Sequence, residues 1–240
     1  MSNTYFQFKQ FRIGQEHCAM KVCTDACIQG AYTAAALQKA TLPVGRALDI
    51  GTGTGLLSLM LAQQLPGAIF DAIELDEAAS RQAQENARHS PWPDRINVRH
   101  GDARTFLYPQ PYDLIICNPP FYGQDLKSGD ERINRARHAV ELDFSGLLAI
   151  ADRWLKKEGL LGIMLPGHRF AAFATLAAGR GLFPERLLQV RQTPRHDFFR
   201  SIALFSCQPR ENLMEELTIM NGNAYTPECA ALLQPYYLYL

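Results

Sequence analysis

The stretch Arg46–Leu65, which reads RALDIGTGTGLLSLMLAQQL, decides the fold. Its first part, Arg46–Ile50, is a short apolar run typical of a buried strand, and Leu56–Leu65 has the length and apolar character of a helix. Glycines stand between them at positions 51, 53 and 55. Glycine lets the backbone turn tightly and lets a ligand approach the main chain. The stretch therefore predicts a strand, a glycine turn and a helix, with a ligand bound near the turn.

Short apolar segments alternate with helical ones on both sides of this turn. Further strands are predicted over Ile69–Leu75, Ile96–His100, Tyr112–Cys117 and Leu160–Leu165, and further helices over Thr24–Lys39, Asp76–Ser90, Asp143–Lys157 and His168–Arg180. Only about eight residues separate the last two strands, Pro184–Gln192 and Ser201–Cys207, so these should pair antiparallel. We expect a Rossmann-like α/β fold: a mostly parallel seven-stranded sheet with an antiparallel edge strand and helices on both faces.

We expect one domain in which residues 43–210 form the catalytic core. Residues 1–42 form a helical segment before it, and residues 211–240 form a tail that should dock on the core because its end, YYLYL, is apolar. The connection 119–142 is long and polar, and loops of this length are usually functional or disordered.

Composition excludes several classes of protein. The 240 residues include 24 basic and 24 acidic ones, so bulk charge does not hold the chain to nucleic acid or a membrane, although a local basic patch is compatible with this balance. No run approaches the roughly 18 consecutive apolar residues of a membrane helix. The amino terminus lacks the pattern of a secretory signal, and six cysteines in such a chain should stay reduced. We therefore expect a cytoplasmic monomer.

Acidic residues accompany the predicted strands around the glycine turn. Asp49 lies at the turn, Glu74 ends the second strand, and Asp102 follows the third. A carboxylate about 20 residues after such a turn can accept hydrogen bonds from both hydroxyls of a ribose, and Asp102 could accept from an adenine amino group. Leu56 occupies the position of the last glycine in the nicotinamide fingerprint, which weakens an NAD-dependent oxidoreductase without excluding it. The pattern favours a cofactor that contains adenosine.

The fourth strand ends in the tetrapeptide Asn118-Pro119-Pro120-Phe121. Its two prolines stop the strand and remove two amide donors, so the turn presents mainly carbonyl acceptors. The carbonyls of Asn118 and Pro119 could accept the hydrogens of an exocyclic amine while Phe121 stacks on its ring. Acceptors that hold these hydrogens out of plane would restore lone-pair density and stabilise the positive charge that develops as the nitrogen attacks a methyl carbon. The tetrapeptide predicts methyl transfer to nitrogen.

Together these residues resemble the class I S-adenosylmethionine-dependent methyltransferases that methylate amino groups and carry an Asn-Pro-Pro-aromatic motif. In that family the glycine turn holds the methionine part of the cofactor, and the acidic residues after the second and third strands hold its ribose and adenine. The resemblance implies S-adenosylmethionine bound by Asp49, Gly51, Gly53, Gly55, Glu74, Asp102 and Asn118. Phe121 replaces the commoner tyrosine, so it can stack but cannot donate a hydrogen bond.

A closer resemblance covers most of the chain. FKQFRIGQEHCAMKVCTDACIQGAY near the amino terminus, the central AQEN and the aromatic carboxyl-terminal end are similar to the bacterial tRNA(Val) adenine-N6 methyltransferase family. That family methylates adenosine 37, beside the anticodon, which implies a tRNA partner bound at its anticodon loop. Its Met-Lys-x-x-Thr-Asp motif implies that Lys21, Thr24 and Asp25 close over the cofactor, which would make residues 1–42 a cofactor-covering segment.

Basic residues could contact RNA phosphates in two regions. They are Lys127, Arg132, Arg135, Arg137 and His138 in the connection, and Arg186, Arg191, Arg195 and Arg200 around the late hairpin. His17, Cys18, Cys23 and Cys27 match no zinc spacing, so we expect buried helical thiols and no metal site. His196 and Asp197 are expected at the surface of a hairpin turn.

Three alternatives stay open at this point. The first is a protein glutamine N5-methyltransferase, because the Asn-Pro-Pro motif also serves amide nitrogens. The second is the NAD-dependent oxidoreductase, and the third is a non-catalytic RNA-binding relative.

Overall fold

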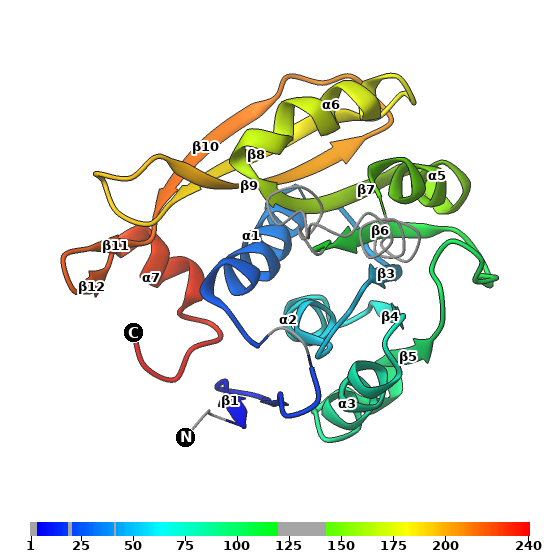
Figure 1. Cartoon of the computed structure of the whole chain (residues 1–240), viewed down its shortest axis with the longest axis horizontal. Coiled ribbons are helices and arrows are strands. Elements are labelled where there is room, and N and C mark those ends of the chain that lie inside the picture. Colours follow the sequence, from blue (N-terminus) through cyan, green and yellow to red (C-terminus); the bar gives the residue numbers. More distant parts are fainter. Residues whose placement is uncertain (1–3, 19–20, 41, 120–142) are drawn as a thin grey trace, which may run out of the picture.

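The computed structural model describes residues 4–18, 21–40, 42–119 and 143–240. Its centre is an eight-stranded sheet with the order β10-β8-β9-β7-β6-β3-β4-β5 (Figure 1). The strands are β3 (Arg46–Ile50), β4 (Ile69–Glu74), β5 (Ile96–His100), β6 (Tyr112–Cys117), β7 (Leu155–Pro166), β8 (Phe183–Arg191), β9 (Phe198–Ser206) and β10 (Leu213–Thr218). Strands β3 to β7 pair parallel, as expected for a class I methyltransferase-like α/β fold.

Two details of the sheet differ from the sequence prediction. The antiparallel strand β9 is not at the edge: it lies between β7 and β8 and runs antiparallel to both. Residues Ser201–Ser206 are buried throughout, which suits an interior strand. The eighth strand, β10, pairs parallel with β8 at the edge. Its Glu215 and Glu216 hide the strand pattern in the sequence, but their carboxylates face Arg186 and Arg191 of β8 at 3.7 and 3.8 Å.

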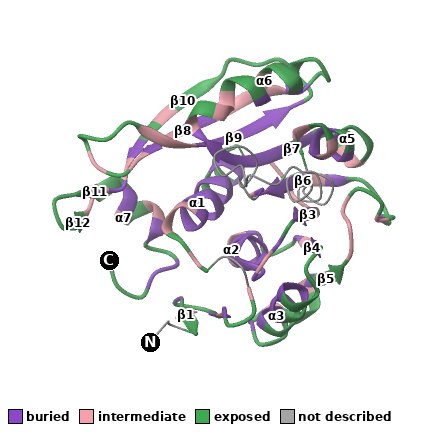
Figure 2. Cartoon of the chain, in the orientation of Figure 1, coloured by how far each residue is buried: buried purple, intermediate pink, exposed green. Residues whose placement is uncertain are grey.

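Helices cover both faces of the sheet, and each face has its own apolar core (Figure 2). Helices α1 (Thr24–Lys39), α2 (Leu56–Gln64), α3 (Glu77–Arg88) and α7 (Pro227–Leu233) contribute to one core, and α5 (Phe144–Trp154) and α6 (Phe170–Ala178) to the other. Helix α5 ends three residues before its predicted end, because β7 begins at Leu155 rather than Leu160. None of the helices in the described ranges has the length and apolar character of a membrane span.

The two ends of the chain pack against each other. An antiparallel hairpin of β1 (Tyr5–Gln7) and β2 (Arg12–Gly14) lies beside the carboxyl-terminal loop (Figure 1). Phe8 forms an isolated bridge with Tyr237, and their rings are 5.9 Å apart. Tyr236 is 1% exposed, so the end of the chain belongs to the core. A second small hairpin, β11 (Met220–Asn221) and β12 (Ala224–Tyr225), precedes α7.

The parallel strands bring the candidate residues to one edge of the sheet. Carboxyl ends of parallel strands meet on the same side, and ligands of such folds bind there. The glycine turn follows β3, Glu74 ends β4, Asp102 follows β5, and Asn118 follows β6. Beyond them, the short 3-10 helix η2 (Gly167–Arg169) follows β7 at the same edge.

Candidate functional site

The glycine turn between β3 and α2 has an unusual backbone. Gly51, Gly53 and Gly55 have φ values of 68°, 57° and 82°, in the left-handed region that favours glycine. A Cβ atom on Gly51 or Gly53 would meet no atom within 4 Å, so both residues face open space. A Cβ on Gly55 would lie 3.6 Å from Ala83 of α3, so this glycine faces the protein instead. The turn therefore leaves its main chain accessible to a ligand at Gly51 and Gly53.

Asp49 lies beneath the turn and is fully buried. Its Oδ2 accepts hydrogen bonds from the hydroxyls of Thr52 and Ser58, both at 2.7 Å, and from the Ser58 amide at 3.2 Å. Burial raises the pKa of Asp49 to about 6, although these hydrogen bonds oppose the shift. Asp49 joins the strand, the turn and the helix from below, and it does not line the pocket at the turn.

Glu74 is fixed beside the turn at the end of β4. Its Oε2 accepts from the Gly53 amide at 2.8 Å, and its Oε1 accepts from the Asp76 amide at 3.0 Å. Each carboxylate oxygen has more than one lone-pair site, so both can still accept a hydroxyl from a ligand. The arrangement presents a carboxylate next to the open face of Gly53.

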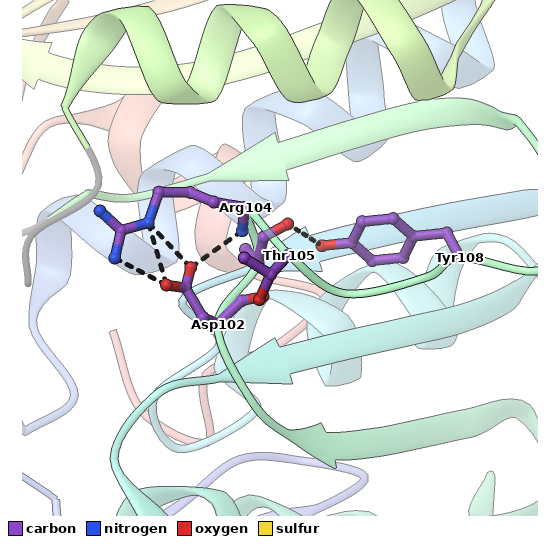
Figure 3. A network of polar contacts seen from close by, with 5 residues as sticks. Asp102, Arg104, Thr105 and Tyr108 are labelled. Carbon is purple, nitrogen blue, oxygen red and sulfur yellow. Dashed lines mark hydrogen bonds and ion pairs between the residues drawn. The ribbon is translucent and has the colours of Figure 1, made fainter.

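Asp102 forms a two-pronged ion pair with Arg104 (Figure 3). Its Oδ1 accepts from the Arg104 amide and Nε, both at 2.9 Å, and its Oδ2 accepts from Nη2 at 2.6 Å. These bonds hold the pKa of Asp102 below its ordinary value. The hydroxyl of Tyr108 donates to the Ala103 carbonyl at 3.1 Å and so fixes the same turn. Asp102 is thus ionised and held in one orientation.

Asn118 presents a buried acceptor at the end of β6. Its Oδ1 is shielded from solvent and has no hydrogen-bond partner within the described ranges. Gln29 of α1 donates to the carbonyl of the preceding residue, Cys117, at 2.9 Å and thereby fixes the strand end. A buried acceptor without a partner is costly, so a ligand that brings a donor to this oxygen would relieve the cost. This atom fits a ligand with a hydrogen-bearing nitrogen.

These elements enclose a pocket at the carboxyl edge of the sheet. It is lined by Lys21, Val22, Cys23, Ala26, Gly51, Thr52, Gly53, Thr54, Leu56, Leu57 and Asn118. Residues from three distant parts of the sequence thus surround one space. The open glycines, the fixed carboxylate of Glu74 beside them and the unpartnered oxygen of Asn118 fit a ligand that carries both hydroxyl and amino donors, as a nucleoside does.

The structure brings some of the predicted site residues together and not others. Lys21, Gly51, Gly53 and Asn118 line the pocket, whereas Pro119 is buried and is not part of its lining. Thr24 and Asp25 do not line it. Asp25 instead accepts from Arg200 Nε at 2.8 Å. Pro120, Phe121, Lys127, Arg132, Arg135, Arg137 and His138 lie outside the described residues.

Three of the four arginines predicted to contact RNA around the late hairpin make contacts within the protein. Arg200 pairs with Asp25, and Arg186 lies 3.7 Å from Glu215 of β10. Arg191 donates to Thr218 at 2.8 Å and lies 3.8 Å from Glu216. Arg195 is exposed, as is the turn that contains His196 and Asp197, which confirms the surface position expected for these two residues.

The thiols differ partly from expectation. Cys27 is buried on α1, but Cys23 is exposed before that helix begins and Cys18 is half-buried. Within the described ranges, no three His, Cys, Asp or Glu side chains gather in a way that could hold a metal ion.

Sequence reasoning missed Arg104 and Gln29. The signal for the Arg104–Asp102 pair is local: the arginine stands two residues after the aspartate that follows a strand. The signal for the contact of Gln29 with the Cys117 carbonyl is a glutamine within the apolar helix α1, because a buried amide needs a partner.

Comparison with known proteins decides the family. The profile described as methyltransferase small domain matches residues 31–170. A relative from Dyadobacter fermentans is 41% identical over 98% of both chains, and one from Tolumonas auensis is 41% identical over 99% of this chain and 98% of its own. Both bear the name tRNA1(Val) (adenine(37)-N6)-methyltransferase. The chain belongs to this methyltransferase family.

Solved structures agree with this fold. An Agrobacterium tumefaciens protein described as a predicted O-methyltransferase has a TM-score of 0.62 at 18% identity, over 88% of this chain and 95% of its own. An RNA methyltransferase-like protein from Pyrococcus horikoshii has a TM-score of 0.54 at 22% identity, over 76% and 81%. At these identities the likeness concerns the fold alone. Membership of the methyltransferase family favours methyl transfer over the nicotinamide alternative.

Proposed function

We propose that this methyltransferase transfers a methyl group from S-adenosylmethionine to N6 of adenine in tRNA, at adenosine 37 beside the anticodon of a valine tRNA. The observation that carries the proposal is the full-length identity of about 40% to relatives with that name. The unpartnered Asn118 oxygen in the pocket supports it, because it is an acceptor for an amino group. S-adenosylmethionine supplies an electrophilic methyl group on a sulfonium.

The cofactor is proposed to lie on the glycine turn. The open main chain at Gly51 and Gly53 would hold its methionine part, with Gly55 shaping the turn from below. Glu74 would accept from the ribose hydroxyls. Asp102, ionised by its pairing with Arg104, would accept from the adenine amino group.

The remaining predicted residues support this site in different ways. Lys21 lines the pocket and would cover the cofactor directly. Thr24 and Asp25 would act indirectly, by positioning the start of α1, because Ala26 in its first turn lines the pocket. Asp49 would act by holding the turn in shape, since it is buried beneath it.

The Asn118-Pro119-Pro120-Phe121 turn would bind and orient the target adenine. Asn118 Oδ1 and the Pro119 carbonyl would accept the two amino hydrogens and direct the nitrogen lone pair out of the ring plane. Phe121 would stack on the base. The chain needs no strong base, because the nitrogen becomes acidic only after it gains the methyl group. Alignment of the nitrogen with the methyl carbon supplies much of the remaining acceleration.

Phosphates of the anticodon loop are proposed to contact Lys127, Arg132, Arg135, Arg137, Arg191 and Arg195. Since the net charge of the chain is zero, binding of tRNA should be modest and should weaken as salt rises. The enzyme is proposed to act as a monomer in the cytoplasm.

The decisive experiment incubates the protein with S-adenosylmethionine labelled in the methyl group and with unmodified tRNA, followed by digestion to nucleosides. We expect the label in N6-methyladenosine and only with valine tRNA among purified species. Label found only in protein glutamine would replace the proposal with the amide-methylating alternative.

Asn118→Ala tests the role of the pocket oxygen. Turnover should fall by at least a hundredfold while the dissociation constant of S-adenosylmethionine changes less than threefold. Asn97→Ala is the matched control, because Asn97 lies on β5 outside the pocket and its side chain makes just one contact with the described part of the chain, at 3.4 Å from Asp71. Unchanged turnover in Asn118→Ala would remove this side chain from the mechanism.

A further inference from the structure

Three elements meet beside the pocket on the carboxyl edge of the sheet. They are the 3-10 helix η2, the beginning of α5 and the tip of the β8–β9 hairpin. Pro166 at the end of β7 pairs in register with Arg200 of β9. A Cβ on Gly167 would lie 2.7 Å from the Phe198 carbonyl, so η2 rests directly on the hairpin and only glycine permits this approach.

The hairpin is also tied to the wall of the pocket. Arg200, which directly precedes the buried residues of β9, donates to Asp25 in the first turn of α1. Ala26, the next residue along, lines the pocket. The surface formed by η2, α5 and the hairpin tip therefore adjoins the place where the target base would be bound.

This surface carries guanidinium groups stacked on aromatic rings. Arg169 of η2 lies over Phe144 of α5 at 4.8 Å, and Arg191 lies over Phe198 at 5.1 Å. Both rings are half-buried, and the Phe144 ring packs edge-on against Phe173, with 5.1 Å between the ring centroids. We call Phe144, Arg169, Arg191, Arg195 and Phe198 the arginine–aromatic surface.

The charge of the arginine–aromatic surface is mainly positive. Arg169 has no carboxylate partner within the described ranges, whereas Arg191 donates to Thr218 at 2.8 Å and lies near Glu216. Arg195 is exposed, and the exposed acid at the hairpin tip is Asp197. A guanidinium is planar, so it can stack on a base by a flat face and donate hydrogen bonds from the N–H groups at its rim.

We propose that the arginine–aromatic surface binds the unpaired nucleotides next to the target adenine by stacking. The proposal rests on the proposed function, in which the substrate is RNA. Bases of an RNA loop unstack easily and are bound on aromatic rings or guanidinium planes, while the same arginines reach the neighbouring phosphates. Asn118 would then hold one base while Arg169 and its neighbours hold those beside it.

Helix α5 provides a matched control at its other end. Arg153 lies over Trp154 at 5.0 Å, in the same kind of pair as Arg169 over Phe144. Trp154 directly precedes β7, so this pair lies at the amino edge of the sheet. Phe144 and Trp154, at the two ends of α5, are about 15 Å apart at the rise of a helix. A general effect of losing an arginine should appear in both Arg169→Ala and Arg153→Ala, whereas an effect on RNA binding should appear only in Arg169→Ala.

The test compares Arg169→Ala, Arg169→Lys and Arg153→Ala with the unaltered enzyme. Each is measured for its KM with tRNA, its kcat, its affinity for S-adenosylmethionine, and its binding of an anticodon stem-loop and of a fully paired RNA of equal length. We expect Arg169→Ala to raise the KM for tRNA about tenfold and to weaken the stem-loop more than the duplex. The kcat at saturating tRNA and the cofactor affinity should change less than twofold, and Arg153→Ala should change nothing.

Several outcomes would overturn this inference while leaving the proposed function intact. An unchanged KM in Arg169→Ala would do so, and so would equal losses in Arg153→Ala. A KM for tRNA in Arg169→Lys equal to that of the unaltered enzyme would show that positive charge alone is enough for RNA binding, because lysine has no flat face for stacking. Binding of an acidic peptide that is lost in Arg169→Ala, with RNA binding retained, would assign the surface to a protein. Failure of the unaltered enzyme to methylate any tRNA would instead overturn the proposed function.

Discussion

The side chain of Asn86 pairs with both main-chain groups of Gly14. Its Oδ1 accepts from the Gly14 amide at 2.8 Å, and its Nδ2 donates to the Gly14 carbonyl at 2.9 Å. The same Nδ2 donates to the Thr54 carbonyl of the glycine turn at 2.9 Å. Gln15, which follows Gly14, accepts a hydrogen bond at 2.9 Å from the amide of Val22, and Val22 lines the pocket. One side-chain amide of α3 thus joins the amino-terminal hairpin to the glycine turn, where the cofactor is proposed to bind.

Asn86→Ala should weaken both folding and cofactor binding. The substitution removes three hydrogen bonds, one buried and two partly buried, which should lower the free energy of unfolding by about 2–4 kcal/mol. Because Gly14 then loses its anchor on α3, and the next residue, Gln15, accepts from the Val22 amide in the pocket wall, the dissociation constant of S-adenosylmethionine should rise about tenfold. Urea unfolding and calorimetry measure the two quantities. Gln84→Ala on the same helix, where one 3.4 Å bond to Val98 is lost, should change neither much. A loss of stability with unchanged cofactor affinity would refute the link.

Gly53→Ala should damage cofactor binding more than stability. Its φ of 57° strains any other residue by about 1–2 kcal/mol, and the added methyl group would stand in the open space where the ligand is proposed to lie. Gly222 is a matched control, because it has a φ of 64° and equally open surroundings but lies in the turn of the β11–β12 hairpin. We expect similar losses of stability in both alanine variants and a loss of cofactor affinity of at least tenfold only in Gly53→Ala. Equal affinities would place the cofactor elsewhere.

Features of the fold that depend on local sequence pattern could be predicted from the sequence. The glycine turn, the parallel strands and most helix bounds follow from apolar runs and from glycines at fixed spacing. Asp49 shows where such reasoning ends. The sequence pattern predicts that this acidic residue contacts the ligand, but alternation along β3 turns its side chain beneath the turn, toward Ser58 of α2, and it does not line the pocket. Which face of a strand a residue occupies depends on neighbours that the local sequence does not identify.

Long-range contacts account for most of what was missed. Gly14 and Asn86 are 72 residues apart, and neither position carries a local signal for the other. Strand β10 was hidden by Glu215 and Glu216, which become compatible with a sheet only when the arginines of β8 lie opposite them. In both cases the role of a polar residue depends on a partner that is distant in the sequence and is brought close only by the fold.

Arg104→Ala should reduce cofactor affinity without unfolding the protein. Arg104 holds both oxygens of Asp102, but the pair is partly exposed, and such pairs contribute at most about 1 kcal/mol to stability. Freed from the guanidinium, the carboxylate can rotate, so the dissociation constants of S-adenosylmethionine and of adenosine alone should both rise several-fold, while that of methionine should not change. Arg99→Ala, on the neighbouring strand β5, is the control and should leave all three unchanged. If adenosine binding survives in Arg104→Ala, Asp102 does not need this partner.

Asp49 should make the stability of the enzyme depend on pH. Its pKa of about 6 in the fold exceeds the value of about 3.9 expected in the unfolded chain. Between these values the folded state binds the extra proton, so the free energy of unfolding falls as pH rises through the window. The loss at neutral pH, relative to acid pH where both states are protonated, amounts to roughly 3 kcal/mol. Asp49→Asn does not titrate, so its free energy of unfolding should rise relative to that of the unaltered enzyme from pH 4.5 to 7.

Asp113 provides the matched control for this measurement. Burial alone would raise the pKa of Asp113, but its bonds with Lys156, Arg46 and Gly45 outweigh burial and lower it. Its contribution is therefore present above pH 4 and is lost only below that, so the difference between Asp113→Asn and the unaltered enzyme should stay flat from pH 4.5 to 7. Urea unfolding at steps of half a pH unit gives both curves. A flat curve for Asp49→Asn as well would mean that Asp49 is ionised throughout, with its hydrogen bonds from Thr52 and Ser58 offsetting the cost of burial.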